Sequence, residues 1–63
     1  MNIPQPNVTH GFVQIWYCTT QDDAEQLITA LRAKFGDKEV ISGPSYSLRL
    51  LKYLVTCIDT RNL

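Results

Sequence analysis

The strongest candidates for a nucleophile or a zinc site are the thiols and the imidazole of this sequence: Cys18, Cys57 and His10. A cysteine nucleophile needs a base held beside it, and nothing in the sequence orients the imidazole of His10 toward either thiol. A structural zinc ion takes four ligands, and these residues fall short of that number. We therefore expect a protein that is not an enzyme, with no catalytic residues, no metal site and no cofactor.

The adjacent acids Asp22 and Asp23 also fail as a catalytic pair. Neighbouring residues on a helix point in different directions, whereas acid–base catalysis needs two carboxyl groups that converge on one substrate. Acids at this position instead cap the first turn of a helix and stabilise the positive end of its dipole. The glycines are isolated and form no phosphate-binding loop, so nothing supports nucleotide binding.

The chain has 63 residues, of which six are basic and six acidic, so its formal net charge is zero. A domain of this size buries only about 60% of the surface that its unfolded chain exposes. Association is one way to enlarge such a small core, and two cysteines allow at most one disulfide as a substitute. Zero net charge provides no field that attracts a polyanion. We expect the partner to be a second copy of the chain or another protein.

No apolar stretch approaches the roughly 20 residues that a membrane-spanning helix needs. The first residues lack the basic start, the apolar centre and the small-residue cleavage site of a signal peptide. We therefore expect a cytoplasmic protein that has no membrane partner.

Residues 1–10 show no hydrophobic periodicity and contain Pro4 and Pro6. Proline removes a backbone donor and pushes the preceding residue toward extended geometry. This segment is predicted to be an extended N-terminal arm, and residues 11–63 are predicted to form a single small domain.

Residues 12–19 are rich in aromatic and β-branched side chains, which predicts a strand. Alternation divides these side chains between two opposite faces, with Val13, Ile15 and Tyr17 on one and Phe12, Gln14, Trp16 and Cys18 on the other. Because neither set is polar, both faces of the predicted sheet carry apolar side chains.

A helix is predicted over residues 21–35. Thr20 is a favourable N-cap, and Gly36 provides a left-handed end. The apolar positions between them follow the three-and-four spacing of a single stripe: Ala24, Leu27, Ile28, Leu31 and Phe35.

Residues 38–42 predict a short strand, and Gly43, Pro44 and Ser45 predict a turn after it. The conformation of residues 46–60 is ambiguous, because large apolar side chains occupy both faces of residues 48–58 whether they form a helix or a strand. Leucines favour the helix, whereas β-branched residues and the preceding turn favour the strand. We choose the strand and keep the helix as the alternative.

These elements assemble as an α+β protein of the order β-α-β-β. A right-handed crossover through the helix makes the first two strands parallel, and the long third strand fits between them, antiparallel to both. The prediction is a three-stranded, mostly antiparallel sheet with one helix on one face, which resembles half of a ferredoxin-like fold.

The predicted function is protein–protein interaction through the sheet face that the helix leaves uncovered. A regulatory factor, an inhibitor or an adaptor, including a virus-encoded one, fits this description by analogy. The expected partner-binding residues are aromatic and aliphatic: Phe12, Trp16, Leu51, Tyr53 and Val55. The alternative hypothesis is a nucleic-acid-binding module, since a small sheet with exposed aromatics resembles the RNA-recognition fold.

Overall fold

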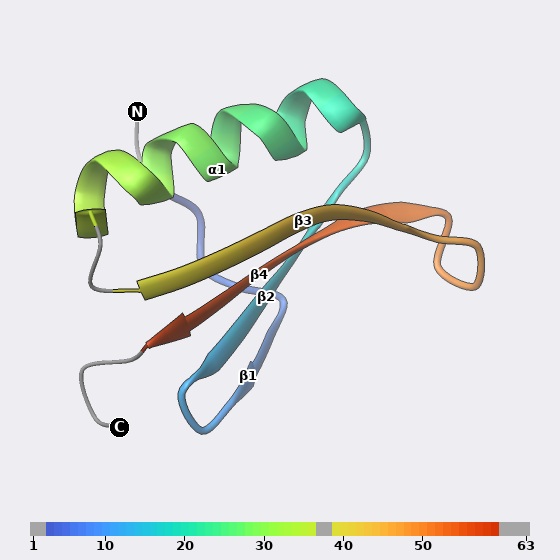
Figure 1. Cartoon of the computed structure of the whole chain (residues 1–63). Helices are drawn as coiled ribbons and strands as arrows, with labels where there is room; N and C mark the ends of the chain where they lie inside the picture. The colour runs from blue at the N-terminus through green and yellow to red at the C-terminus, as the bar shows by residue number, and fades with distance from the viewer. Residues whose placement is uncertain (1–2, 37–38, 60–63) are drawn as a thin grey trace.

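The computed structural model describes residues 3–36 and 39–59 of the chain. Their regular elements follow the order β1 (Val8–His10), β2 (Val13–Cys18), α1 (Gln21–Phe35), β3 (Glu39–Ser47) and β4 (Lys52–Asp59). The strands form one sheet, and α1 lies across one of its faces (Figure 1).

The sheet has the strand order β1-β2-β4-β3, and each neighbouring pair is antiparallel. The last strand of the chain, β4, lies between β2 and β3, as the sequence predicts. The α+β class with a single helix is therefore confirmed for the described residues. The predicted number of strands is wrong, because the sheet has four strands rather than three.

The additional strand, β1, comes from the end of the predicted N-terminal arm. His10 pairs with Val13, so Gly11 and Phe12 form a two-residue hairpin turn in which Gly11 has a φ of 61°. Such a turn needs positive φ, which glycine adopts without steric cost. The predicted boundary after residue 10 thus falls inside a hairpin.

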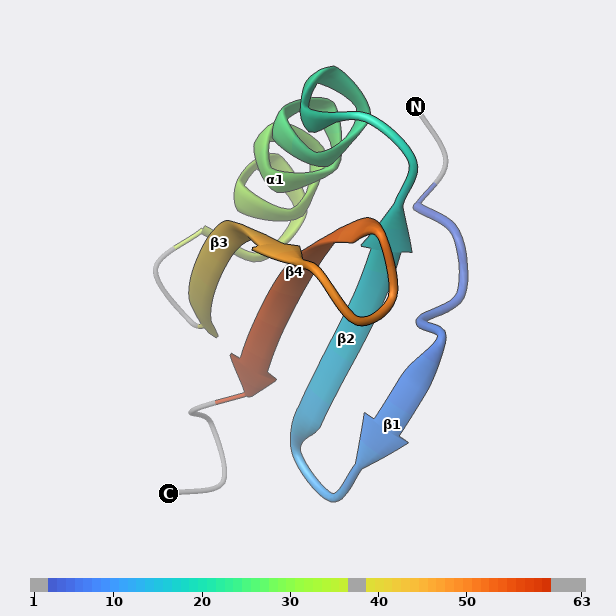
Figure 2. The ribbon, with the colours of Figure 1, turned by 90° about the vertical axis from the view of Figure 1, so that its right-hand side faces the viewer.

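Residues before β1 are also fastened to the sheet. The Asn7 backbone N–H donates to the Ile15 carbonyl at 2.8 Å, and the Asn7 side-chain Oδ1 accepts from the Tyr17 N–H at 2.9 Å. The indole Nε1 of Trp16 donates to the Pro4 carbonyl at 2.8 Å. Hydrogen bonds therefore hold this extended segment beside β2, where Figure 2 shows it running toward the N-terminus.

The helix begins and ends where the sequence predicts. The Thr20 side chain accepts a hydrogen bond from the Asp23 N–H at 3.1 Å, which satisfies one of the free donors of the first turn. At the other end Gly36 has a φ of 61° and donates its N–H to the Arg32 carbonyl.

The predicted turn at residues 43–45 is wrong. Strand β3 continues through these residues by means of a bulge between Ser42 and Ser45, and the Gly43-Pro44 peptide bond is cis. The reversal occurs later, at residues 48–51, so β4 begins only at Lys52. The strand interpretation therefore holds from Lys52 to Asp59 and fails for the leucines before it, while residue 60 lies outside the described residues.

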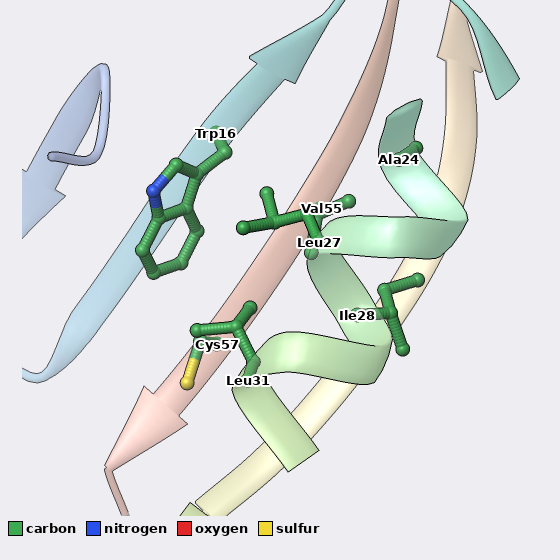
Figure 3. Packing of buried hydrophobic residues seen from close by; sticks show 7 residues of the cluster. All are labelled: Trp16, Ala24, Leu27, Ile28, Leu31, Val55 and Cys57. Carbon is green, nitrogen blue, oxygen red and sulfur yellow. The ribbon is translucent and has the colours of Figure 1, made fainter. Parts of the chain in front are cut away.

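The core lies between α1 and the covered face of the sheet (Figure 3). Its buried members come from α1, β2 and β4: Trp16, Ala24, Leu27, Ile28, Leu31, Val55 and Cys57. The helix contributes four of them with the spacing of one stripe. Because this core is small, many of the large apolar side chains of the chain lie outside it.

Candidate interaction surface

The two faces of the sheet differ in what covers them. Trp16 and Val55 are direct cross-strand partners, so they lie on the same face, and both are buried beneath α1 with exposed fractions of 3% and 0%. The prediction that they lie on the uncovered face is wrong. Alternation correctly groups side chains by face, but it does not say which group the helix covers.

The opposite face carries the other set of alternating residues, and no helix or strand of the described chain packs on it (Figures 1 and 2). Its centre is formed by two neighbouring strands, with Val13, Ile15 and Tyr17 on β2 and Leu54, Thr56 and Ile58 on β4. All six side chains are partly exposed. Val8 on β1 and Val40 on β3 extend this apolar surface to both edges. We call this side of the sheet the open face, and these eight residues are its apolar part.

The open face carries almost no charge. The register places His10 at one corner of it, opposite Val13. Lys52 stands at the other end, where its Nζ lies 3.5 Å from the Thr19 hydroxyl. Cross-strand neighbours on β3 are the neutral Ser42 and Ser45. An uncharged apolar surface of this kind can meet a copy of itself without like-charge repulsion.

The bulge in β3 determines on which face of the sheet the β3 side chains after it lie. Ser42 pairs with Thr56, and Ser45 pairs with Leu54. The two serines are three residues apart on β3, whereas their partners are only two residues apart on β4, so β3 contains one extra residue. Because a one-residue shift moves a side chain to the other face, this extra residue keeps both serines on the open face. It also brings Tyr46 beside Tyr53, where the two rings pack edge to face with centroids 4.8 Å apart.

The predicted partner-binding residues are not brought together. Tyr53 lies on the covered side of the sheet and packs partly against the core. Phe12 occupies the β1–β2 turn with half of its surface exposed, and Leu51 belongs to the β3–β4 loop. The open face was nevertheless foreseeable as the second alternating set of residues 12–19. The nucleic-acid alternative loses its main aromatic, because the buried Trp16 ring has no face free for a base.

Both edges of the sheet disfavour the addition of another strand. On one side β1 has only three residues. On the other side the bulge in β3 contains Pro44, which has no N–H to donate. Short edge strands, bulges and proline are the usual means by which proteins prevent edge-to-edge pairing. The broad face, rather than an edge, is therefore the available surface.

The residues with nucleophilic chemistry lie apart. Cys57 is buried in the core on the covered face, whereas His10 belongs to the open face. Cys18 lies at the far end of β2 from His10 and lines a hollow of about 330 Å³ together with Asp23 and Leu27. Burial, and next the negative charge of Asp23, raise the pKa of the Cys18 thiol. A thiol held protonated is a poor nucleophile.

The two cysteines do not bridge each other. Cys57 is opposite Gln14, four residues along β2 from Cys18, which corresponds to about 13 Å of strand. This separation is too large for a disulfide. Within residues 3–36 and 39–59 no three His, Cys, Asp or Glu side chains gather as metal ligands would.

Comparison with known proteins identifies no relative of this chain. No family model matches the chain, and neither a curated protein nor a solved structure shows significant similarity to it. The described part of the chain contains no helix that is long and apolar enough to cross a membrane.

Proposed function

We propose that the protein is a small, non-enzymatic interaction module that associates with a second copy of itself through the open face. The observation that carries this proposal is the uncovered, uncharged centre of the sheet on β2 and β4. Exposed contiguous apolar surface is costly in a monomer and marks a contact site. Regulatory, inhibitory or adaptor activity of the resulting dimer remains part of the proposal.

A second copy is the simplest occupant for three reasons. The core of one chain is small, and face-to-face packing adds a second apolar layer, as in a β-sandwich. The face lacks charges that repel each other across a twofold axis. The edges of the sheet are blocked, so a continuous sheet across two chains is disfavoured.

The size of the open face predicts a weak dimer. Four strands spaced about 4.8 Å apart, which contribute on average about six residues of about 3.3 Å, span roughly 400 Å². A standard stable interface buries about 800 Å² of each partner. The open face supplies on the order of half of that area, so we expect a dimer that dissociates in the micromolar range or above.

Sedimentation of the purified chain over a range of concentrations tests the proposal. Ile15 lies at the centre of the open face between Val8 and Thr56, and Ile15→Lys would place two like charges against each other. We expect reversible dimerisation of the wild-type chain and a monomer for Ile15→Lys. Thr29→Lys is the matched control, because it adds the same charge on the exposed surface of α1 and leaves the dimer intact.

Two outcomes would contradict the proposal. One is a wild-type chain that stays monomeric throughout. The other is equal dimerisation of Ile15→Lys and Thr29→Lys, which would place the contact elsewhere. Far-ultraviolet circular dichroism of each variant confirms that a loss of association is not a loss of fold.

A further inference from the structure

The loop between β3 and β4 is the most exposed apolar segment of the described chain. Residues 48–51 read Leu-Arg-Leu-Leu, and Leu48 and Leu51 have exposed fractions of 82% and 66%. Leu50 is exposed as well. Hairpin loops usually carry glycine, asparagine, aspartate, proline or serine. Figure 1 shows this loop at the end of the β3–β4 hairpin, beyond the start of α1. We call it the leucine loop.

The leucine loop contains a residue in an unfavourable backbone conformation. Leu51 has a φ of 55°, a left-handed conformation that costs a branched side chain energy and that glycine or asparagine would adopt more easily. Leucine at this position is therefore not explained by the turn itself. The same residue is largely exposed, so packing within the chain does not explain it either.

Two backbone donors of the leucine loop are satisfied by Ser47, the last residue of β3. Ser47 accepts twice: its side-chain Oγ from the Leu50 N–H at 3.2 Å and its carbonyl from the Leu51 N–H at 2.7 Å. A segment that enters an apolar medium must satisfy its backbone groups internally, because no water remains to bind them. These two bonds lower the cost of moving the tip out of water.

Basic and aromatic side chains flank the leucines. Arg49 lies between Leu48 and Leu50 in the loop, and Lys52 begins β4. Tyr46 and Tyr53 form the second row of the β3–β4 ladder counted from the loop, and their rings pack together. Leucine suits the hydrocarbon of a bilayer, whereas lysine, arginine and tyrosine suit its headgroup region. The acids of this end belong to the first turn of α1, which Figure 1 shows set back from the loop.

We propose that the leucine loop is an interfacial membrane anchor, which inserts its leucines into a lipid surface while Arg49 and Lys52 contact anionic headgroups. A convex apolar tip fits a bilayer better than a protein groove, which would need a matching concave site. The proposal departs from the sequence expectation of no membrane partner, which considered only membrane-spanning segments. It does not require dimerisation, since the leucines of the loop lie outside the open face and only Lys52 borders both surfaces.

Co-sedimentation with vesicles tests the anchor. The probes are vesicles of phosphatidylcholine alone and of phosphatidylcholine mixed with phosphatidylserine. We expect binding to the mixed vesicles, weaker binding to the neutral ones, and a decrease in the former as salt is raised. The double variant Leu48→Ser/Leu51→Gly should lose roughly tenfold in affinity for each leucine removed from the interface.

Two comparisons separate an effect on the anchor from an effect on the fold. Leu51→Gly alone removes the strained residue, so its melting temperature should equal or exceed that of the wild type while vesicle binding falls. Arg49→Glu should weaken binding to the mixed vesicles several-fold, whereas Lys34→Glu makes the same charge change on α1 and should not. Absence of binding to the mixed vesicles at low salt would overturn the proposal. Unchanged binding of the double variant would overturn it too.

Discussion

The covered and open faces of the sheet are built from the same kinds of residue but have opposite roles. On β2, Trp16 lies on the covered face and its neighbours Ile15 and Tyr17 lie on the open face. Each set is apolar, yet only the first is buried by α1. An apolar strand residue thus belongs to the core or to a contact surface according to where one helix packs, and not according to its own hydrophobicity.

The largest effect should come from the covered face. Trp16→Ala removes a buried ring and its hydrogen bond to Pro4, so we expect a loss of about 3–5 kcal/mol in the free energy of unfolding. For so small a domain this loss approaches the whole stability. Urea denaturation monitored by circular dichroism measures it.

Phe12→Ala is the control for that experiment, because Phe12 is half exposed in a turn and should cost less than about 1 kcal/mol. A similar loss for both variants would show that the buried and exposed aromatics do not differ as the structure indicates.

A smaller loss of stability should follow from a substitution at Gly43, in the bulge of β3. A Cβ at Gly43 would lie 2.6 Å from the Leu54 carbonyl oxygen, and Gly43 has a φ of 116°. Gly43→Ala should therefore destabilise the fold by roughly 2 kcal/mol or more, through backbone strain and displacement of β4.

Gly36→Ala provides the comparison, since Gly36 also has positive φ but a Cβ added there would meet no atom within 4 Å. Thermal unfolding of the two variants should show the larger fall in melting temperature for Gly43→Ala. Equal falls would mean that the close approach to β4 is not a constraint on the sheet.

Much of the fold is predictable from local signals, whereas the interaction surface is not. The cap at Thr20 and the stop at Gly36 fix the helix because both act through neighbouring backbone groups. The reversal at the leucine loop was not predicted, because this loop contains none of the usual turn residues. Gly43-Pro44 has the sequence of a turn, but these residues form a bulge within β3 instead. Which face of β2 is covered depends on long-range packing, and two apolar faces offer no local signal to decide it.

The smallest predicted effect concerns Cys18, at the edge of the covered face. Because the pKa of this thiol is raised above its usual value of 9.0, its alkylation by iodoacetamide should reach half of the maximal rate at a higher pH than that of an unfolded cysteine. Because its pKa is higher in the folded chain, the Cys18 thiol stays protonated to a higher pH there than in the unfolded chain. The contribution of Cys18 to the free energy of unfolding is therefore complete below the pKa of the unfolded chain. It is lost as pH rises through the pKa of the folded chain.

Asp23→Asn tests the cause of this shift. Removing the negative charge should move the alkylation profile of Cys18 part of the way back, since burial is the larger cause and remains. A profile that matches an unfolded cysteine in the wild-type chain would contradict the placement of Cys18 beside the core.

The most direct test of the central claim is isotope-filtered nuclear Overhauser spectroscopy on a mixture of labelled and unlabelled chains, which detects contacts between copies only. At concentrations where the chain dimerises, we predict intermolecular contacts among the methyl groups of Ile15, Leu54 and Ile58 on the open face. Intermolecular contacts confined to α1 or to the edge strands, or none at all, would contradict the account.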